Sequence, residues 1–182
     1  MMKLRWKLVS FPSDELRSFV LTLIATLIGV FIAISLTNSG LRKKEKEDTL
    51  KLLNTSKLIV INTRTYSVEL SNRIRALEQD TINSDSTRIS NVKKNNPIPF
   101  PHLLETVITN EILSKNISEY SHNEIYTELI NLKKLADYKT AALYEQSLSD
   151  LIYLLDLEIQ FQKGELEIEE IGKKMKLKHN EF

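Results

Sequence analysis

Residues 19–36 of this chain read FVLTLIATLIGVFIAISL, and they lie inside a stretch without charged side chains that covers residues 18–41. Eighteen helical residues rise about 27 Å at ~1.5 Å per residue, close to the ~30 Å hydrocarbon thickness of a bilayer. No other run of this length in the chain is free of charge. We therefore predict one transmembrane helix at residues 18–40, preceded by a juxtamembrane segment at residues 1–17.

A secretory signal peptide is the alternative for this segment, because basic residues precede the apolar run and small residues follow it. Two features favour a retained anchor. The apolar run is longer than the ~7–15 residues of a signal-peptide core. The basic cluster RKKEK at residues 42–46 follows the run at once, as the flank of a stop-transfer segment does.

The basic residues near the ends of the span predict its orientation, because Lys and Arg accumulate on the cytoplasmic side of a membrane. Four of them precede the span: Lys3, Arg5, Lys7 and Arg17. Six follow it: Arg42, Lys43, Lys44, Lys46, Lys51 and Lys57. The excess after the span predicts that the C-terminal part of the chain is cytoplasmic.

The composition of the chain restricts its fold and its chemistry. The formal net charge of the 182 residues is +1, so no overall field attracts nucleic acid. The absence of cysteine excludes disulfides, cysteine-ligated zinc and thiol catalysis. Only four glycines and four prolines interrupt the sequence, which favours long helices. We predict an all-α protein in which a soluble helical bundle follows the transmembrane helix.

The segments just after the span differ in their apolar spacing. Residues 41–79 contain no proline or glycine and carry apolar residues at helical intervals, which predicts a long post-membrane helix. Within it, residues 57–68 are rich in β-branched side chains and have strand propensity, although no partner strand is evident. Residues 80–101 are rich in Asn, Ser, Asp and Thr and end in PIPFP, so we predict a loop. Its prolines either stiffen the approach to the next helix or form a ligand for a partner domain.

A helical bundle is predicted for residues 102–182. Its first helix covers residues 101–115, and SHNE at residues 121–124 matches the capping box that begins the next one. No breaker follows before Gly164, and a single helix of ~40 residues is long for a globular domain, so we predict a bend near residues 136–139. An amphipathic last helix follows Gly164.

No catalytic, cofactor-binding or metal-binding motif is present in the sequence. His102, His122 and His179 each stand alone, without a second histidine or a carboxylate at metal-site spacing. The basic patches are mixed with acidic or loop residues, which is typical of solvated faces and lipid contacts. We therefore expect no enzyme, no cofactor, no metal and no direct binding of nucleic acid.

Small and hydroxyl-bearing side chains recur along one face of the predicted span, and they are Ser18, Thr22, Ala25, Thr26, Gly29 and Ala33. We call this set the small-residue stripe. Such faces let helix backbones approach each other within a membrane, so we predict a homo-oligomer. In a ring of copies, the hydroxyls are also what a narrow wet pore presents. The alternative is a lone anchor that contains small residues by chance.

Three segments carry a resemblance to known proteins: LIGVFIAISLTN at residues 27–38, KKEKEDTLKLL at residues 43–53 and NPIPFPHLLETVITN at residues 96–110. Together with the size and layout of the chain, they resemble small one-span helical membrane proteins of bacteria and the accessory membrane proteins of type VI-B CRISPR systems. The resemblance implies a bacterial inner-membrane location and assembly into a pore that permeabilises or depolarises the membrane. It also implies a role in RNA-guided antiphage defence, with an RNA-guided effector or its signal as partner.

The same family has been discussed as carrying a divergent RNase-like motif, whose usual form is an Arg a few residues before a His. The nearest segment here, NISEYSH at residues 116–122, has the His and lacks the Arg. We therefore expect a pore rather than a nuclease. The alternative is a membrane-anchored scaffold that recruits a soluble partner without forming a pore. A third possibility is an enzyme whose site assembles from residues distant in the sequence.

Overall fold

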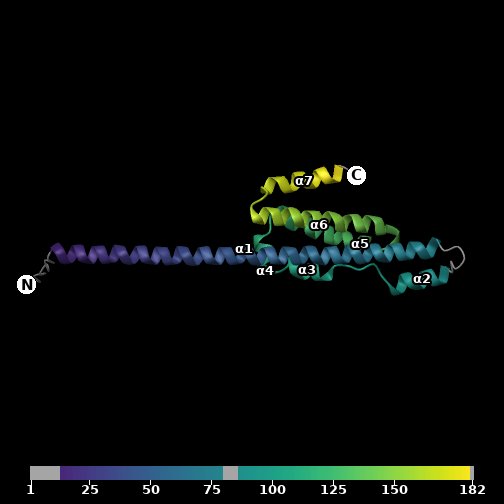
Figure 1. Cartoon of the computed structure of the whole chain (residues 1–182), viewed down its shortest axis with the longest axis horizontal. Helices are drawn as coiled ribbons and strands as arrows, with labels where there is room; N and C mark the ends of the chain where they lie inside the picture. The colour runs from purple at the N-terminus through teal and green to yellow at the C-terminus, as the bar shows by residue number, and fades with distance from the viewer. Residues whose placement is uncertain (1–12, 80–85, 181–182) are drawn as a thin grey trace, which may run out of the picture. The chain divides into compact units, whose positions relative to one another are not determined.

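The computed structural model describes residues 13–79 and 86–180, and every regular element in these two ranges is helical (Figure 1). The elements are α1 (Ser13–Gln79), α2 (Ser86–Asn95), α3 (His102–Ile108), α4 (Glu111–Asn116), α5 (Glu119–Leu135), the 3-10 turn η1 (Tyr138–Thr140), α6 (Ala141–Lys163) and α7 (Ile168–Asn180). The all-α prediction is confirmed, and the strand alternative for residues 57–68 is wrong. Most of the predicted juxtamembrane segment, residues 1–12, lies outside the described residues.

The chain divides into two compact units, Met1–Lys44 and Glu45–Phe182. α1 begins in the first unit and ends in the second, as a single helix of 67 residues. Residues 41–79 continue it because they contain neither proline nor glycine. The predicted transmembrane helix and the predicted post-membrane helix are therefore parts of one helix.

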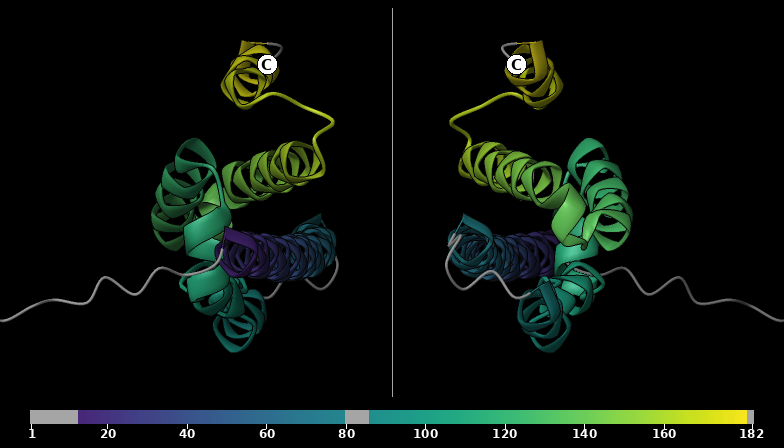
Figure 2. Two further views of the ribbon diagram at one scale, coloured as in Figure 1. Left: turned by 90° about the vertical axis from the view of Figure 1, so that its left-hand side faces the viewer. Right: turned by 90° about the vertical axis from the view of Figure 1, so that its right-hand side faces the viewer.

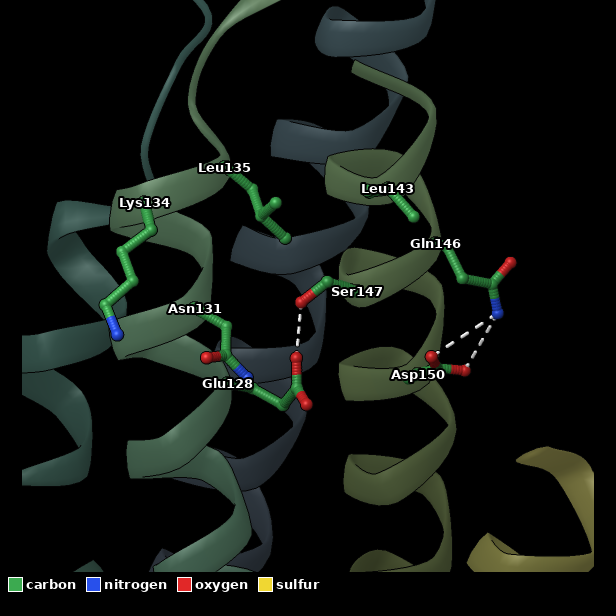
Figure 3. Close-up of a pocket in the computed structure, with 8 residues that line it drawn as sticks. All are labelled: Glu128, Asn131, Lys134, Leu135, Leu143, Gln146, Ser147 and Asp150. Atoms are coloured by element: carbon green, nitrogen blue, oxygen red, sulfur yellow. Dashed lines mark hydrogen bonds between the residues drawn. The ribbon is translucent and has the colours of Figure 1, made fainter. Parts of the chain in front are cut away.

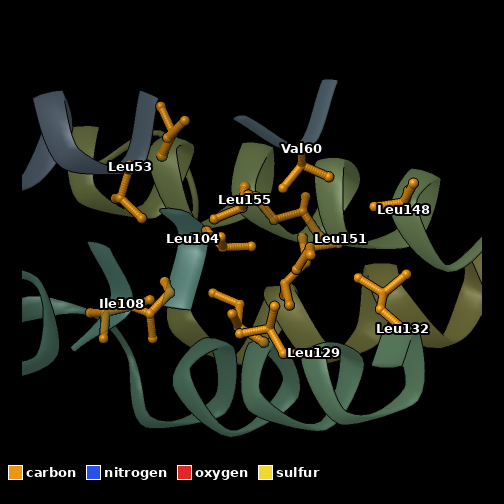
Figure 4. Packing of buried hydrophobic residues seen from close by; sticks show 14 of the residues in the cluster. Leu53, Val60, Leu104, Ile108, Leu129, Leu132, Leu148, Leu151 and Leu155 are labelled. Carbon is orange, nitrogen blue, oxygen red and sulfur yellow. The ribbon is translucent and has the colours of Figure 1, made fainter. Parts of the chain in front are cut away.

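The core of the second unit is built around α6, which packs against α5, η1 and α7 (Figures 1 and 2). Leucines at intervals of three and four residues put one apolar face of α6 inside. Full burial of each such side chain stabilises the fold by about 1.5–3 kcal/mol. α1, α3, α5 and α6 all contribute to this cluster, as Figure 4 shows, through Leu53, Val60, Leu104, Ile108, Leu129, Leu132, Leu148, Leu151 and Leu155.

Polar contacts fix the register of α6 against the second-unit part of α1. Lys57 Nζ lies 2.5 Å from Asp156 Oδ1, and Arg64 Nε donates to Ser149 Oγ at 2.7 Å. Both groups of the ion pair remain partly exposed to solvent, so its contribution is modest, on the order of 1 kcal/mol or less. The apolar cluster supplies most of the stability, and these contacts set which residues face each other.

The breaks around α6 fall where the sequence predicts them. α5 ends at Leu135, and Asp137 Oδ1 accepts a hydrogen bond from Lys139 N at 2.8 Å at the start of η1, which confirms the bend predicted near residues 136–139. α6 ends at Gly164, whose φ of 82° lies in the left-handed region that glycine adopts without steric penalty.

The capping box predicted at residues 121–124 is wrong. Ser118 caps α5 instead, and its Oγ accepts from Ser121 N at 3.2 Å. Ser121 lies in the first turn, buried, and its hydroxyl has no hydrogen-bond partner within the structure. The cap is displaced because Glu158 accepts hydrogen bonds from both the backbone N–H and the hydroxyl of Ser118.

Two other boundaries differ from the sequence prediction. The single helix predicted over residues 101–115 is two short helices, because Asn110 caps α4 by accepting from Ile112 N at 3.0 Å and so ends the preceding helix. Within the loop predicted at residues 80–101, α2 occupies Ser86–Asn95, while residues 80–85 lie outside the described residues. No residue of α2 is fully buried, and Lys93 Nζ pairs with Glu78 Oε1 of α1 at 2.6 Å.

Candidate functional site

The first unit presents one helix that is long and apolar enough to cross a membrane, and none of its apolar window is buried by the described chain. A signal sequence near an N-terminus meets the same criterion of length and composition. Large side chains such as Leu21, Ile28 and Phe31 are at least half exposed. A contiguous apolar surface of this size is typical of segments that contact lipid or another protein.

The small-residue stripe lies along this apolar part of α1. Its members fall on one face because each lies three or four residues from another member in a helix with 3.6 residues per turn. Thr22 Oγ1 donates to Ser18 O at 2.8 Å, and Thr26 Oγ1 donates to Thr22 O at 2.8 Å. The threonine donors are therefore satisfied within the helix, and only their acceptor lone pairs are free for a neighbouring helix or for water.

Gly29 lies at the centre of the stripe. A Cβ added at this position would meet no other atom within 4 Å. Nothing inside the described chain therefore requires a glycine there. Glycine in a helix interior is about 1 kcal/mol less favourable than alanine, so its presence calls for a reason outside a single helix. A close approach by a second helix supplies such a reason.

The second unit carries a polar cluster that the sequence reasoning missed, in a groove of about 300 Å³ (Figure 3). Its walls come from α5 and α6 and consist of Glu128, Asn131, Lys134, Leu135, Leu143, Gln146, Ser147 and Asp150. In the sequence the cluster is marked only by Asp150, an acidic residue between Leu148 and Leu151 of α6. The spacing of apolar residues does not distinguish it from an ordinary solvent-exposed position.

Asp150 connects this groove to α7. Its Oδ1 lies 2.7 Å from Lys178 Nζ, and its Oδ2 lies 3.6 Å from His179 Nε2. Lys178 also donates to Ser149 O at 3.0 Å and lies 4.9 Å from the centre of the Tyr153 ring. These contacts hold α7 against α6, so the role of Asp150 here is structural.

The groove does not assemble the groups that nucleophilic or metal chemistry needs. The hydroxyl of Ser147 donates to Glu128, and His179 contacts Asp150 rather than a hydroxyl. The other two histidines lie elsewhere: His102 contacts Phe100 and Glu105, and His122 contacts Tyr126. Within residues 13–79 and 86–180, no three His, Cys, Asp or Glu side chains are grouped to hold a metal ion.

Glu128 gives the bundle a testable pH dependence. Burial raises the pKa of its carboxyl above the ordinary value of 4.5, the hydrogen bond from Ser147 lowers it, and the neighbouring Asp150 carboxylate raises it. The native state therefore holds this proton more tightly than the unfolded state. The resulting stabilisation is fully present below the ordinary value and is lost as the pH rises through the raised native value.

Replacement of the Glu128 carboxylate by a neutral amide removes the free-energy cost of burying its charge at neutral pH. We expect Glu128→Gln to raise the free energy of unfolding at neutral pH slightly, by roughly 0.5 kcal/mol or less, and to flatten the acidic part of its pH profile. Denaturant unfolding of the full chain over a pH series measures both effects. A variant that loses stability at neutral pH would show that the ionised carboxylate is favourable in the groove.

No protein-family model matches this chain, and no curated protein or solved structure is similar enough to match it.

Proposed function

We propose that this chain is a homo-oligomeric membrane protein that forms a pore and thereby permeabilises or depolarises the bacterial inner membrane. The observation that carries the proposal is the small-residue stripe, which lies on the apolar part of α1, where none of the apolar window is buried by the described chain. Small side chains at its centre permit close contact between copies. The satisfied threonines leave hydroxyl oxygens that can accept hydrogen bonds from water.

The setting of this activity follows from the resemblance to type VI-B CRISPR accessory membrane proteins. On that basis, the pore strengthens RNA-guided antiphage defence, and an RNA-guided effector or its signal triggers it. The second unit supplies a stable helical body with an apolar core and a polar groove. Such a body is suited to receive a signal from a soluble partner.

Reconstitution of the purified full chain in lipid vesicles tests the proposal. We expect the protein to release a trapped ion or small dye, and the doubly substituted Thr22→Leu, Thr26→Leu chain to release less, because a pore without polar lining tends to dewet. Vesicles that remain tight under every condition, with the protein inserted, would support the non-pore scaffold instead.

The proposed topology places the C-terminus in the cytoplasm. The basic residues Arg42, Lys43 and Lys44 follow the span directly, and such clusters remain on the cytoplasmic side. Two reporters fused after residue 182 test this topology. A reporter that functions in the cytoplasm should be active, and a reporter that functions only in the periplasm should be inactive. Activity of the periplasmic reporter would show that the orientation is reversed.

A further inference from the structure

A shallow groove of about 470 Å³ lies on α1 where the apolar run meets the basic cluster, and its lining residues are Phe31, Ile34, Ser35, Asn38, Ser39 and Arg42. We call it the juxtamembrane groove. Its polar members are spaced by three, four and seven residues from Ser35, so they share one face of the helix. Gly29 and Asn38 are nine residues apart, or two and a half turns, which puts the groove opposite the small-residue stripe.

The polar side chains of the juxtamembrane groove lack partners. Among the described residues, none of the four makes a hydrogen bond or an ion pair with another part of the chain. Three threonines of the same helix differ, because each of their hydroxyls donates to a backbone carbonyl four residues earlier. Thr37 Oγ1, for example, donates to Ala33 O at 2.9 Å, and Thr22 and Thr26 make the same kind of bond. The groove therefore offers a guanidinium, an amide and two hydroxyls to an external acceptor.

The position of the groove in the sequence defines what that acceptor is. Phe31 and Ile34 belong to the apolar run, whereas Arg42 is the first charged residue after it. In an inserted helix this interval coincides with the boundary between hydrocarbon and headgroups. The molecule that meets it there has an acyl chain on the apolar side and a phosphate on the polar side. Arg42 is the charged residue among those that line the groove, so the charge of the groove itself favours an anion.

We propose that the juxtamembrane groove binds the phosphate of an anionic phospholipid. Arg42 supplies paired N–H donors to the phosphate oxygens, and Asn38 with Ser39 supplies further donors. The acyl chain lies along Phe31 and Ile34. This site uses the face of α1 that the proposed oligomer contact leaves free. It rests on the membrane insertion that the proposed function requires, and it does not depend on the pore.

The site is tested by native mass spectrometry, which measures the binding of added lipids to the intact detergent-solubilised chain. We expect phosphatidylglycerol to bind about tenfold more tightly than phosphatidylcholine, and Arg42→Gln to lose about tenfold in that affinity, as the loss of one charge-assisted contact implies. Lys44→Gln is the matched control, because it removes the same charge from a different face of the helix. It should retain the preference within about twofold.

Two further arms decide between this site and its alternatives. Asn38→Leu keeps the charge and removes an amide donor to the phosphate, which both lipids carry, so it should weaken the binding of both lipids and leave the preference for phosphatidylglycerol in place. Inorganic phosphate should not displace the lipid, because it lacks the acyl chain. Equal losses in Arg42→Gln and Lys44→Gln, or displacement by inorganic phosphate, would overturn the proposal.

Membrane insertion is checked first by alkaline extraction of membranes that contain the wild-type chain. Release of the chain from the membrane would overturn both the proposed function and the lipid site. Retention of the chain without a preference for phosphatidylglycerol would overturn the lipid site alone.

Discussion

Gly29→Leu should leave the protein in the membrane fraction but abolish its oligomer and its permeability. Within one chain a Cβ at this position meets no other part of the described structure within 4 Å, and the substitution increases the hydrophobicity of the span. Between chains, a leucine at the centre of the small-residue stripe holds the backbones apart. Cross-linking of native membranes and vesicle leakage measure the two losses, each expected to be about tenfold or more, since a disrupted helix interface loses more than ~1.4 kcal/mol.

Two variants accompany this measurement. Val30→Leu also adds bulk to the apolar run but lies outside the small-residue stripe, so it should retain both assembly and leakage. The Thr22→Leu, Thr26→Leu chain separates the two roles of the hydroxyls: a pore lining predicts reduced leakage with an intact oligomer, whereas a packing role predicts a weakened oligomer. Full assembly and leakage in Gly29→Leu would mean that the stripe is merely the composition of an anchor.

Glu158→Ala should produce a large loss of stability in the second unit. The carboxylate is fully buried and accepts hydrogen bonds from Ser118 N at 3.0 Å, from Ser118 Oγ at 2.6 Å and from Gln162 Nε2 at 2.9 Å. Its removal leaves the two Ser118 donors without a partner at the start of α5, whereas Gln162 Nε2 keeps its hydrogen bond to Asn116 O at 2.7 Å. We expect the free energy of unfolding to fall by roughly 2–4 kcal/mol, because each buried unsatisfied group costs about 1–3 kcal/mol.

Circular dichroism during denaturant unfolding of the full chain measures this change. Glu165→Ala is the matched control, since Glu165 is exposed just after the end of α6, and it should change the unfolding free energy by no more than about 0.5 kcal/mol. Glu158→Gln keeps an acceptor oxygen and should recover part of the loss. If Glu158→Ala unfolds at the same denaturant concentration as the wild type, the buried carboxylate does not organise the start of α5.

Much of the helical architecture was predictable because it depends on local composition. The scarcity of glycine and proline is sufficient to indicate long helices, and the left-handed residue Gly164 ends α6 where its position indicates. The bend between α5 and α6 follows from the length of the run. The small-residue stripe is equally visible in the sequence, because residues four apart on a helix share a face whatever the rest of the fold does.

The remaining features depend on contacts between distant residues. Ser118 and Ser121 are the same residue type three positions apart, and Ser118 becomes the cap because Glu158, forty residues later, accepts its hydrogen bonds. Asp150 contacts α7 through Lys178 and His179, which lie far from it in the sequence. α2 forms in a polar segment, and the ion pair between Lys93 of α2 and Glu78 of α1 connects it to the long helix. Spacing within one segment contains no information about such partners.

The mass of the detergent-purified full chain, measured by light scattering with the detergent contribution subtracted, tests the central claim most directly. One chain has a mass of 21.0 kDa. A homo-oligomeric pore predicts a single species at a fixed multiple of that mass, and the Gly29→Leu chain should shift toward the mass of one chain. A wild-type protein that remains at 21.0 kDa in several mild detergents would contradict the pore.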